Sequence, residues 1–181
     1  MAILNKSQTD KQSKDYWRTP FNLVDDALKL LSIDAFDIDV CCKDESVKIP
    51  YAYWCIQESQ DALSDDVQWF SQLNMSGHCT TSFCNPPFSQ KWKFFNKAAE
   101  QSKKWGKSVL MVLPYTPATK QWHENVHGQD CIIYVPDGRY QYLLPDGTKP
   151  VNSCNFETCL ILIVPFKCGN VIVNYKRGLN G

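Results

Sequence analysis

The spacing of apolar residues predicts three helices in this chain. Residues 19–31 open with a Thr-Pro pair suited to the N-cap and first position of a helix, and the apolar residues that follow recur every three or four positions. A second helix is expected from Ser89, as its N-cap, to about Trp105, where Gly106 provides a stop. Residues 119–126 predict a third, shorter helix.

Alternating or continuous apolar runs predict strands between and after these helices. Residues 36–40 alternate apolar and acidic side chains, and residues 81–84 form a short strand that must stop at Pro86, because two consecutive prolines cannot continue a central strand. Further strands are expected over residues 51–55, 108–113, 131–135, 139–144, 156–165 and 171–175. This order predicts an α/β fold with a mixed, mainly parallel sheet, helices on both faces and antiparallel C-terminal strands at one edge.

Residues 15–181 are expected to form a single domain. A chain of 181 residues is long enough to bury one continuous core. Residues 1–14 are polar and lack periodicity, which favours a flexible N-terminal arm, and residues 74–78 have the composition of a loop.

The charges balance, which argues against a strong attraction of the whole surface to polyanions. The chain has 19 basic and 19 acidic residues and a formal net charge of zero. A group of lysines after residue 88 would contact a few phosphates locally, or would simply form a solvated helix face. These are Lys91, Lys93, Lys97, Lys103, Lys104 and Lys107.

The nine cysteines do not predict a disulfide framework. Their number is odd and no secretory leader is evident, so reduced thiols in a cytoplasmic protein are expected, in the host cell if the protein is phage-encoded. No CxxC pair occurs, and His123 and His127 lack a third ligand, so no metal site is expected. No apolar run approaches the roughly 18 residues of a membrane span.

The tetrapeptide Asn85-Pro86-Pro87-Phe88 has the chemistry to hold an exocyclic amino group. Such amines are poor nucleophiles, so an enzyme must accept hydrogen bonds from both N–H groups and align the nitrogen with a methyl donor. The Asn85 side-chain oxygen can accept one hydrogen and the Pro86 carbonyl the other, while Phe88 can stack on a base. An ordinary loop is an equally good interpretation of the tetrapeptide alone. Its place after a buried strand, however, is where open α/β sheets bind ligands.

Four motifs, taken in order, resemble the phage-type Dam family of DNA N6-adenine methyltransferases. They are Asp15-Tyr16-Trp17-Arg18-Thr19-Pro20, Phe36-Asp37-Ile38-Asp39-Val40-Cys41-Cys42, Asp61-Ala62-Leu63 with Trp69 behind it, and Phe83-Cys84-Asn85-Pro86-Pro87-Phe88-Ser89, with a weaker match at Gly138-Arg139. The resemblance implies a Rossmann-like fold dependent on S-adenosylmethionine. It also implies methyl transfer to the N6 amino group of adenine in DNA.

The resemblance also implies which residues bind the cofactor. They are Trp17, Thr19, Pro20, Asp39, Cys41, Asp61, Ala62 and Asn85. The first three would line its methionine end with Asp39 nearby, and Asp61 would accept a hydrogen bond from its adenine amino group. Without the resemblance, a core ring for Trp17 and a helix cap or solvated acid for Asp61 are the preferred interpretations.

Two positions depart from the family's pattern. Cys41-Cys42-Lys43 stands where most methyltransferases carry a glycine-rich turn and the phage-type family commonly has alanines, but cysteine is also small enough for close approach of the cofactor. Phe88 stands where tyrosine is common, which removes a hydroxyl and keeps the stacking face.

Candidate substrate-binding residues lie at the end of the tetrapeptide and after a later turn. Phe88, Ser89, Arg139 and Tyr140 are the candidates, and Arg139 would contact a phosphate or base edge or else be a surface arginine. Reaching adenine in a duplex requires base flipping, which Tyr115, Trp122, Tyr140 or Tyr142 would assist. Methylation of RNA adenine or protein glutamine, and a catalytically silent nucleic-acid-binding relative, remain alternatives. The oligomeric state stays open.

Overall fold

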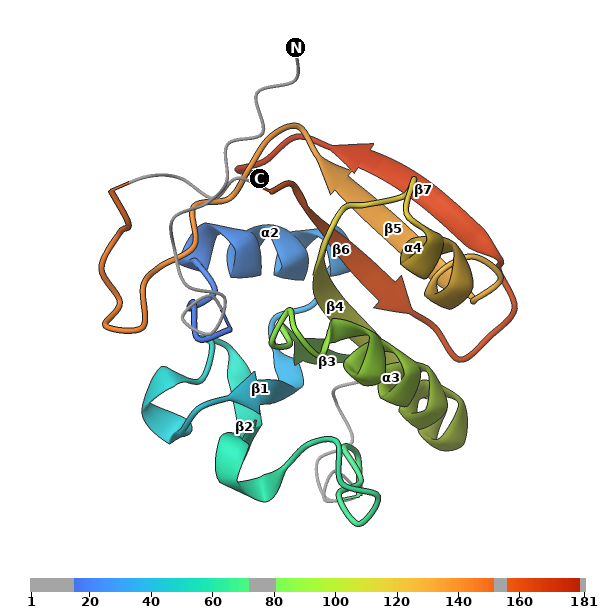
Figure 1. The fold of residues 1–181 in the computed structure, drawn as a ribbon, viewed down its shortest axis with the longest axis horizontal. Helices are drawn as coiled ribbons and strands as arrows, with labels where there is room; N and C mark the ends of the chain where they lie inside the picture. The colour runs from blue at the N-terminus through green and yellow to red at the C-terminus, as the bar shows by residue number, and fades with distance from the viewer. Residues whose placement is uncertain (1–14, 72–80, 152–155, 180–181) are drawn as a thin grey trace.

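The computed structural model describes residues 15–71, 81–151 and 156–179, and within them the strands form one seven-stranded sheet of order β2-β1-β3-β4-β6-β5-β7 (Figure 1). The strands are β1 (Phe36–Cys42), β2 (Ala52–Gln57), β3 (Thr81–Cys84), β4 (Ser108–Pro114), β5 (Cys131–Pro136), β6 (Thr158–Ile163) and β7 (Asn170–Tyr175). The helices are α2 (Phe21–Leu31), α3 (Lys91–Trp105) and α4 (Lys120–Asn125), with 3₁₀ turns at Glu45–Val47 and Glu58–Gln60. The expected arm over residues 1–14 and the loop over 74–78 lie outside the described residues.

The expected α/β fold with a mainly parallel sheet is confirmed. Strand β1 pairs in parallel with β2 and β3, and β3 pairs in parallel with β4. The antiparallel pairing expected in the C-terminal third is made by β6, which lies between β4 and β5 and runs opposite to both. The edge strand β7 returns to the parallel direction beside β5.

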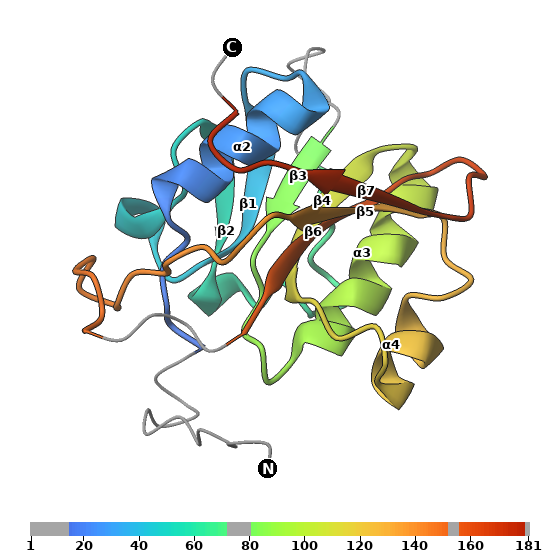
Figure 2. The same cartoon turned by 90° about the horizontal axis from the view of Figure 1, so that it is seen from above.

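Helices cover both faces of the sheet, as Figure 2 shows. Helix α2 buries Leu23, Val24, Ala27 and Leu28, whose spacing places them on one helix face against the sheet. Helices α3 and α4 pack on the opposite face, where Trp122 of α4 joins the second buried cluster. Each face therefore has its own apolar core, and the sheet itself is buried between them.

The helix starts differ by one or two residues from the expected ones. Helix α2 begins at Phe21 with Pro20, in extended conformation, as its N-cap, so Thr19 lies outside the helix. Helix α3 begins at Lys91 with Gln90 as its N-cap. Ser89 does not cap α3. Its backbone N–H instead donates to Asp15 Oδ1 at 3.1 Å, and this hydrogen bond connects the segment before α3 to the segment before α2.

The strand predicted over residues 139–144 is wrong. This segment is an extended loop whose single bridge joins Leu143 to Arg18. The physical reason lies in the topology: β5 already has β6 on one side and β7 on the other, so the residues after β5 cannot fold back and pair with it. Backbone groups there must pair elsewhere, and two of them pair with the N-terminal segment.

The strand order places a topological switch point between β1 and β3. From β1 the chain moves to β2 on one side, and it then returns to add β3 on the other side. Open α/β sheets bind ligands outside the carboxyl ends of the strands at such a point, because the connecting loops diverge there and leave a crevice. No helix of the described residues is long and apolar enough to cross a membrane.

Candidate active site

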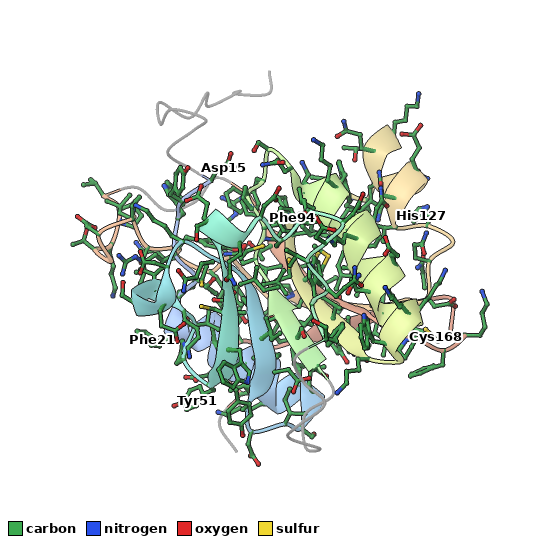
Figure 3. All side chains as sticks on the ribbon, turned by 90° about the horizontal axis from the view of Figure 1, so that it is seen from below. Asp15, Phe21, Tyr51, Phe94, His127 and Cys168 are labelled. Atoms are coloured by element: carbon green, nitrogen blue, oxygen red, sulfur yellow. The ribbon has the colours of Figure 1, made fainter. Side chains whose placement is uncertain are left out.

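A cavity of about 660 Å³ lies at the carboxyl ends of β1, β2 and β3. Its walls come from residues 15–19, the end of β1 and the loop after it, the end of β2, residues 61–63, and Asn85. In Figure 3, Asp15 and Phe94 of this lining lie toward one end of the sheet, and Tyr51, which precedes β2, lies toward the other. The volume is in the range of sites for small organic ligands, roughly 300–1,000 Å³.

Asn85 lies directly after β3 and presents an unused acceptor. Its Nδ2 donates to Thr19 Oγ1 at 2.9 Å, which orients the amide. Its Oδ1 is buried and has no hydrogen-bond partner among the described residues. The Pro86 carbonyl likewise accepts no hydrogen bond from them. A buried acceptor without a partner costs about 1–3 kcal/mol, so this arrangement is suited to a ligand that brings N–H donors.

A second, much smaller cavity adjoins the first at Asn85. Its volume is about 10 Å³, and it is lined by Trp17, Phe88, Tyr142 and Phe156 among others. The Phe88 ring meets Phe156 edge-on at 5.0 Å between ring centroids and Tyr142 at 6.3 Å. Three aromatic rings therefore close the space in front of the Asn85 amide.

The segment that precedes α2 is anchored on three sides. Asp15 accepts the Ser89 N–H, and Arg18 and Leu143 exchange two backbone hydrogen bonds of 2.9 and 3.1 Å. Tyr16 Oη donates to Glu58 Oε1 at 3.1 Å across the cavity mouth. These contacts bring the first motif of the chain against the third and fourth motifs.

Asp39 is 3% exposed and connects β1 to the following loop. Its two oxygens accept the backbone N–H groups of Cys41 at 3.3 Å and Ile49 at 3.0 Å. Burial raises the pKa of the Asp39 carboxyl to about 6, although these two hydrogen bonds and Lys48 act in the opposite direction. The carboxyl lines the large cavity, so a cationic ligand group there would favour its ionised form.

Asp61 and Ala62 form the wall opposite the N-terminal segment. Asp61 has a φ of 48°, a left-handed conformation that Asp tolerates better than most residues, and its Oδ1 accepts the Leu63 N–H at 3.1 Å. Ala62 is buried, and its carbonyl accepts Trp69 Nε1–H at 2.9 Å. The fully buried Trp69 thus holds this turn against the core.

Two thiols lie at the switch point. Cys41 lines the large cavity, and its Sγ is 3.6 Å from Cys84 Sγ at the end of β3. Burial raises the pKa of the Cys41 thiol well above its ordinary value, so it is kept protonated. The described cysteines, seven in number, are all free thiols. Cys79 and Cys154 lie outside the described residues.

Most predicted site residues meet at these two cavities, but four, namely Pro20, Ser89, Arg139 and Tyr140, do not line them. Pro20 is buried at the start of α2. Arg139 is half-exposed and lies 3.9 Å from Glu157 as an ion pair. Tyr140 is 1% exposed and donates its hydroxyl to Asp26 at 2.6 Å within the core. The structure therefore does not bring Tyr140 to a surface that a substrate could reach.

The lysines after residue 88 are only partly available to a ligand. Lys97 is buried and donates to the Ser64 carbonyl, Lys104 donates to Gln68 Oε1 at 2.8 Å, and Lys107 lies 3.9 Å from Asp37. Lys93 and Lys103 are exposed.

Two residues of the site, Glu58 and Phe156, are not among those predicted from the sequence. Glu58 directly follows β2, and an acidic residue at that strand end was a readable signal for binding ribose hydroxyls. Phe156 precedes β6 and lines the small cavity with Tyr142, which the sequence suggested only for base flipping. No local pattern marks Phe156, because its place depends on the fold.

His123 and His127 face each other, with ring centroids 4.2 Å apart. No group of three or more potential metal ligands occurs in the part of the chain that the structure describes.

Comparison with known proteins gives two matches over nearly the whole chain. A family profile described as DNA N-6-adenine-methyltransferase (Dam) matches residues 6–178. The chain is also similar to a DNA N-6-adenine-methyltransferase of Haemophilus phage HP1 (strain HP1c1), with 27% identity over 163 residues that cover 90% of this chain and 86% of that protein. The profile match spans all four motifs that build the two cavities.

Proposed function

The chain belongs to the Dam family of DNA N-6-adenine-methyltransferases, and from this premise we propose that it transfers a methyl group from S-adenosylmethionine to adenine N6 at specific sites in DNA. The observation that carries the proposal is the buried Asn85 Oδ1 without a partner, between a ligand-sized cavity and a ring-lined one. The large cavity would hold the cofactor and the small one the target base.

The lining of the large cavity fits S-adenosylmethionine, which supplies an electrophilic sulfonium methyl group. The volume of about 660 Å³ is sufficient, and carboxylates at the ends of β1 and β2 suit its cationic and hydroxyl groups. We assign Asp39 and the Trp17–Thr19 segment to its methionine end, and Glu58 to its ribose. We assign Asp61, with Ala62, to the amino group of the cofactor's adenine. The small side chain of Cys41 would let the backbone approach the cofactor closely.

Asn85 and Pro86 would act directly on the target amine. The Asn85 Oδ1 accepts one N6–H and the Pro86 carbonyl accepts the other, which fixes the nitrogen and favours the charge that develops on it during transfer. Thr19 keeps the Asn85 amide in the required orientation through its 2.9 Å hydrogen bond. No step in this scheme requires a metal ion or a protonated acid.

Phe88 would stack on the base after the small cavity opens. A space of about 10 Å³ has room for about one water, so an adenine ring enters only if Phe88 separates from Phe156 and Tyr142. Edge-on aromatic contacts are worth about 1 kcal/mol each, which base stacking can replace. Arg139 and Ser89 are left to contact the DNA backbone beside the flipped base.

A methyl-transfer experiment tests the function directly. The protein is incubated with radiolabelled S-adenosylmethionine and with DNA, RNA or protein in separate reactions, and the labelled product is digested and identified. We expect label in N6-methyladenine from DNA. Label found only in RNA adenine or only in protein glutamine would contradict the proposal that DNA is the substrate. Binding of the cofactor without any transfer would identify a catalytically silent relative.

A further inference from the structure

Trp17, which lines both cavities, carries a second unused hydrogen-bonding group. Its indole Nε1 is buried and has no partner among the described residues, as is also true of Asn85 Oδ1. Both residues line the same small cavity with Phe88. Buried donors and acceptors almost always find partners in folded proteins, so an unpaired donor and an unpaired acceptor in one cavity call for a ligand that satisfies both.

The surrounding contacts fix the Asn85 amide and the backbone that follows Trp17. The hydrogen bond from Asn85 Nδ2 to Thr19 holds the amide, so its oxygen cannot turn away. Trp17 precedes Arg18, whose backbone is paired in both directions with Leu143. The donor and the acceptor are therefore presented together by two rigid segments that meet only in the folded chain.

We propose that the Trp17 indole N–H donates to the ring nitrogen beside the amino group of the target base, so that Trp17 and Asn85 read one base edge together. This inference rests on the proposed function and extends it to base selection. In adenine the amino group, a donor, stands next to a ring nitrogen that is an acceptor. Asn85 Oδ1 and Trp17 Nε1–H are the complementary acceptor and donor.

The same pair disfavours the bases that present a carbonyl oxygen in place of the amine. Guanine and thymine would place an acceptor against Asn85 Oδ1, which leaves two buried oxygens facing each other. Cytosine has the same donor and acceptor order as adenine, but its single ring offers less surface for stacking on Phe88. Selection of adenine over cytosine is then left to the aromatic walls of the cavity.

Base analogues test the contact without relying on loss of activity alone. Transfer is measured on duplexes that carry the mapped target site with adenine, 1-deazaadenine or 7-deazaadenine, each of which keeps the amino group. The ratio of kcat/KM between wild type and Trp17→Phe is compared on each duplex, so that changes in duplex stability cancel. Coupling between the indole N–H and one ring nitrogen appears as a difference between these ratios.

We expect Trp17→Phe to lower kcat/KM about tenfold on adenine and on the analogue that keeps the contacted nitrogen, as the loss of one buried hydrogen bond implies. On the analogue that lacks this nitrogen, wild type and variant should be equal. Because phenylalanine keeps an aromatic ring beside the methionine end of the cofactor, S-adenosylmethionine affinity should fall by much less than tenfold. An equal loss on all three duplexes, or a loss confined to cofactor affinity, overturns the proposal.

Trp105→Phe is the matched control, because its indole nitrogen is also buried without a partner but its side chain lines neither cavity. The ratio of kcat/KM between wild type and Trp105→Phe should be the same on all three duplexes. If Trp17→Phe unfolds, replacement by benzothienylalanine, which keeps the bicyclic ring and lacks the N–H, carries the same test. Absence of DNA methylation by the wild type would instead reject the proposed function, whatever the variants do.

Discussion

At the scale of single residues, the site is built from polar groups that the protein does not satisfy by itself. Asn85 uses its amide nitrogen on Thr19 and keeps its oxygen unpaired, and Trp17 keeps its N–H unpaired nearby. By contrast, both oxygens of Asp39 accept hydrogen bonds from backbone N–H groups, and burial nevertheless raises the pKa of this carboxyl. Different roles are therefore expected for these residues, and each can be separated experimentally.

Asn85→Ala should strongly reduce the rate of methyl transfer and leave cofactor binding largely intact. The variant removes the acceptor for one N6–H, and loss of one preorganised hydrogen bond to a developing charge lowers kcat by roughly 10²–10³. Steady-state transfer and calorimetric S-adenosylmethionine binding measure the two effects separately. Asn96→Ala, at an exposed position of α3, is the control. Wild-type kcat in the Asn85 variant would reject the mechanism.

Cofactor affinity should depend on pH through Asp39. Burial raises the pKa of the carboxyl to about 6 in the free protein, and an ammonium group in the cavity favours the ionised form. Affinity is therefore complete above that pKa and falls as the pH drops through about 6, by up to about tenfold per pH unit below it. The cofactor α-amino group stays protonated in this range, since its pKa is about 8.

Calorimetric titrations between pH 5 and pH 7, with the fold checked by circular dichroism at each pH, measure this dependence. Asp39→Asn removes the titrating group, so its affinity should be weak and nearly constant over the range. A constant affinity in the wild-type protein would show that Asp39 does not face the ammonium group.

At the scale of elements, the loop over residues 137–151 shows how an irregular segment is held in place. Tyr140 lies under α2, where its hydroxyl contacts Asp26 at 2.6 Å and Tyr175 of β7 at 2.9 Å. Asp26 also accepts the backbone N–H groups of Gly178 and Leu179 at 3.0 Å. One buried carboxylate thus joins a helix, a loop and the residues after the last strand.

Tyr140→Phe should destabilise the protein without changing the chemistry of the site. A hydrogen bond to a charged group contributes about 2 kcal/mol, which for a protein of this size lowers the Tm by roughly 4–8 °C. Thermal unfolding measures the loss. Tyr134→Phe on β5, whose hydroxyl makes no hydrogen bond within the described residues, should have a much smaller effect. A large drop in kcat without any loss of thermal stability would instead indicate that Tyr140 contacts the substrate.

At the scale of the whole molecule, the zero net charge leaves DNA binding to a few local contacts. Four of the six lysines between residues 91 and 107 are held by protein groups, and Lys93 and Lys103 are exposed on α3. Affinity for DNA should therefore depend only modestly on salt, unlike that of strongly basic DNA-binding proteins.

We expect the logarithm of the DNA association constant to fall with the logarithm of salt concentration with a slope of about −3, the value for roughly three phosphate contacts. Fluorescence anisotropy between low and physiological salt measures it. Lys93→Gln and Lys103→Gln should each make the slope shallower by about 1 if these residues touch phosphates. A slope near −8 in the wild type would show an extended basic DNA-binding surface and would contradict this prediction.

Local sequence determined much of this protein. Apolar periodicity and proline placement predicted β3, the end of α3 at Gly106 and most of the sheet, because those signals act over a few neighbouring residues. The Asn85-Pro86-Pro87-Phe88 chemistry was also readable, since one turn contains both acceptors and the ring. The segment 139–144 was wrongly predicted as a strand because its composition suits one, and only the topology shows that no edge of β5 is free.

Only the tertiary structure decided which groups are left unpaired and which rings face the amide. The Asn85 contact with Thr19 spans 66 residues, and the Phe156 ring that closes the small cavity comes from a segment about 70 residues after Phe88. Tyr140, predicted to contact the substrate, is buried in the core. Burial also raises the pKa of the Asp39 carboxyl. Such effects depend on long-range packing and desolvation, which no local pattern of residues records.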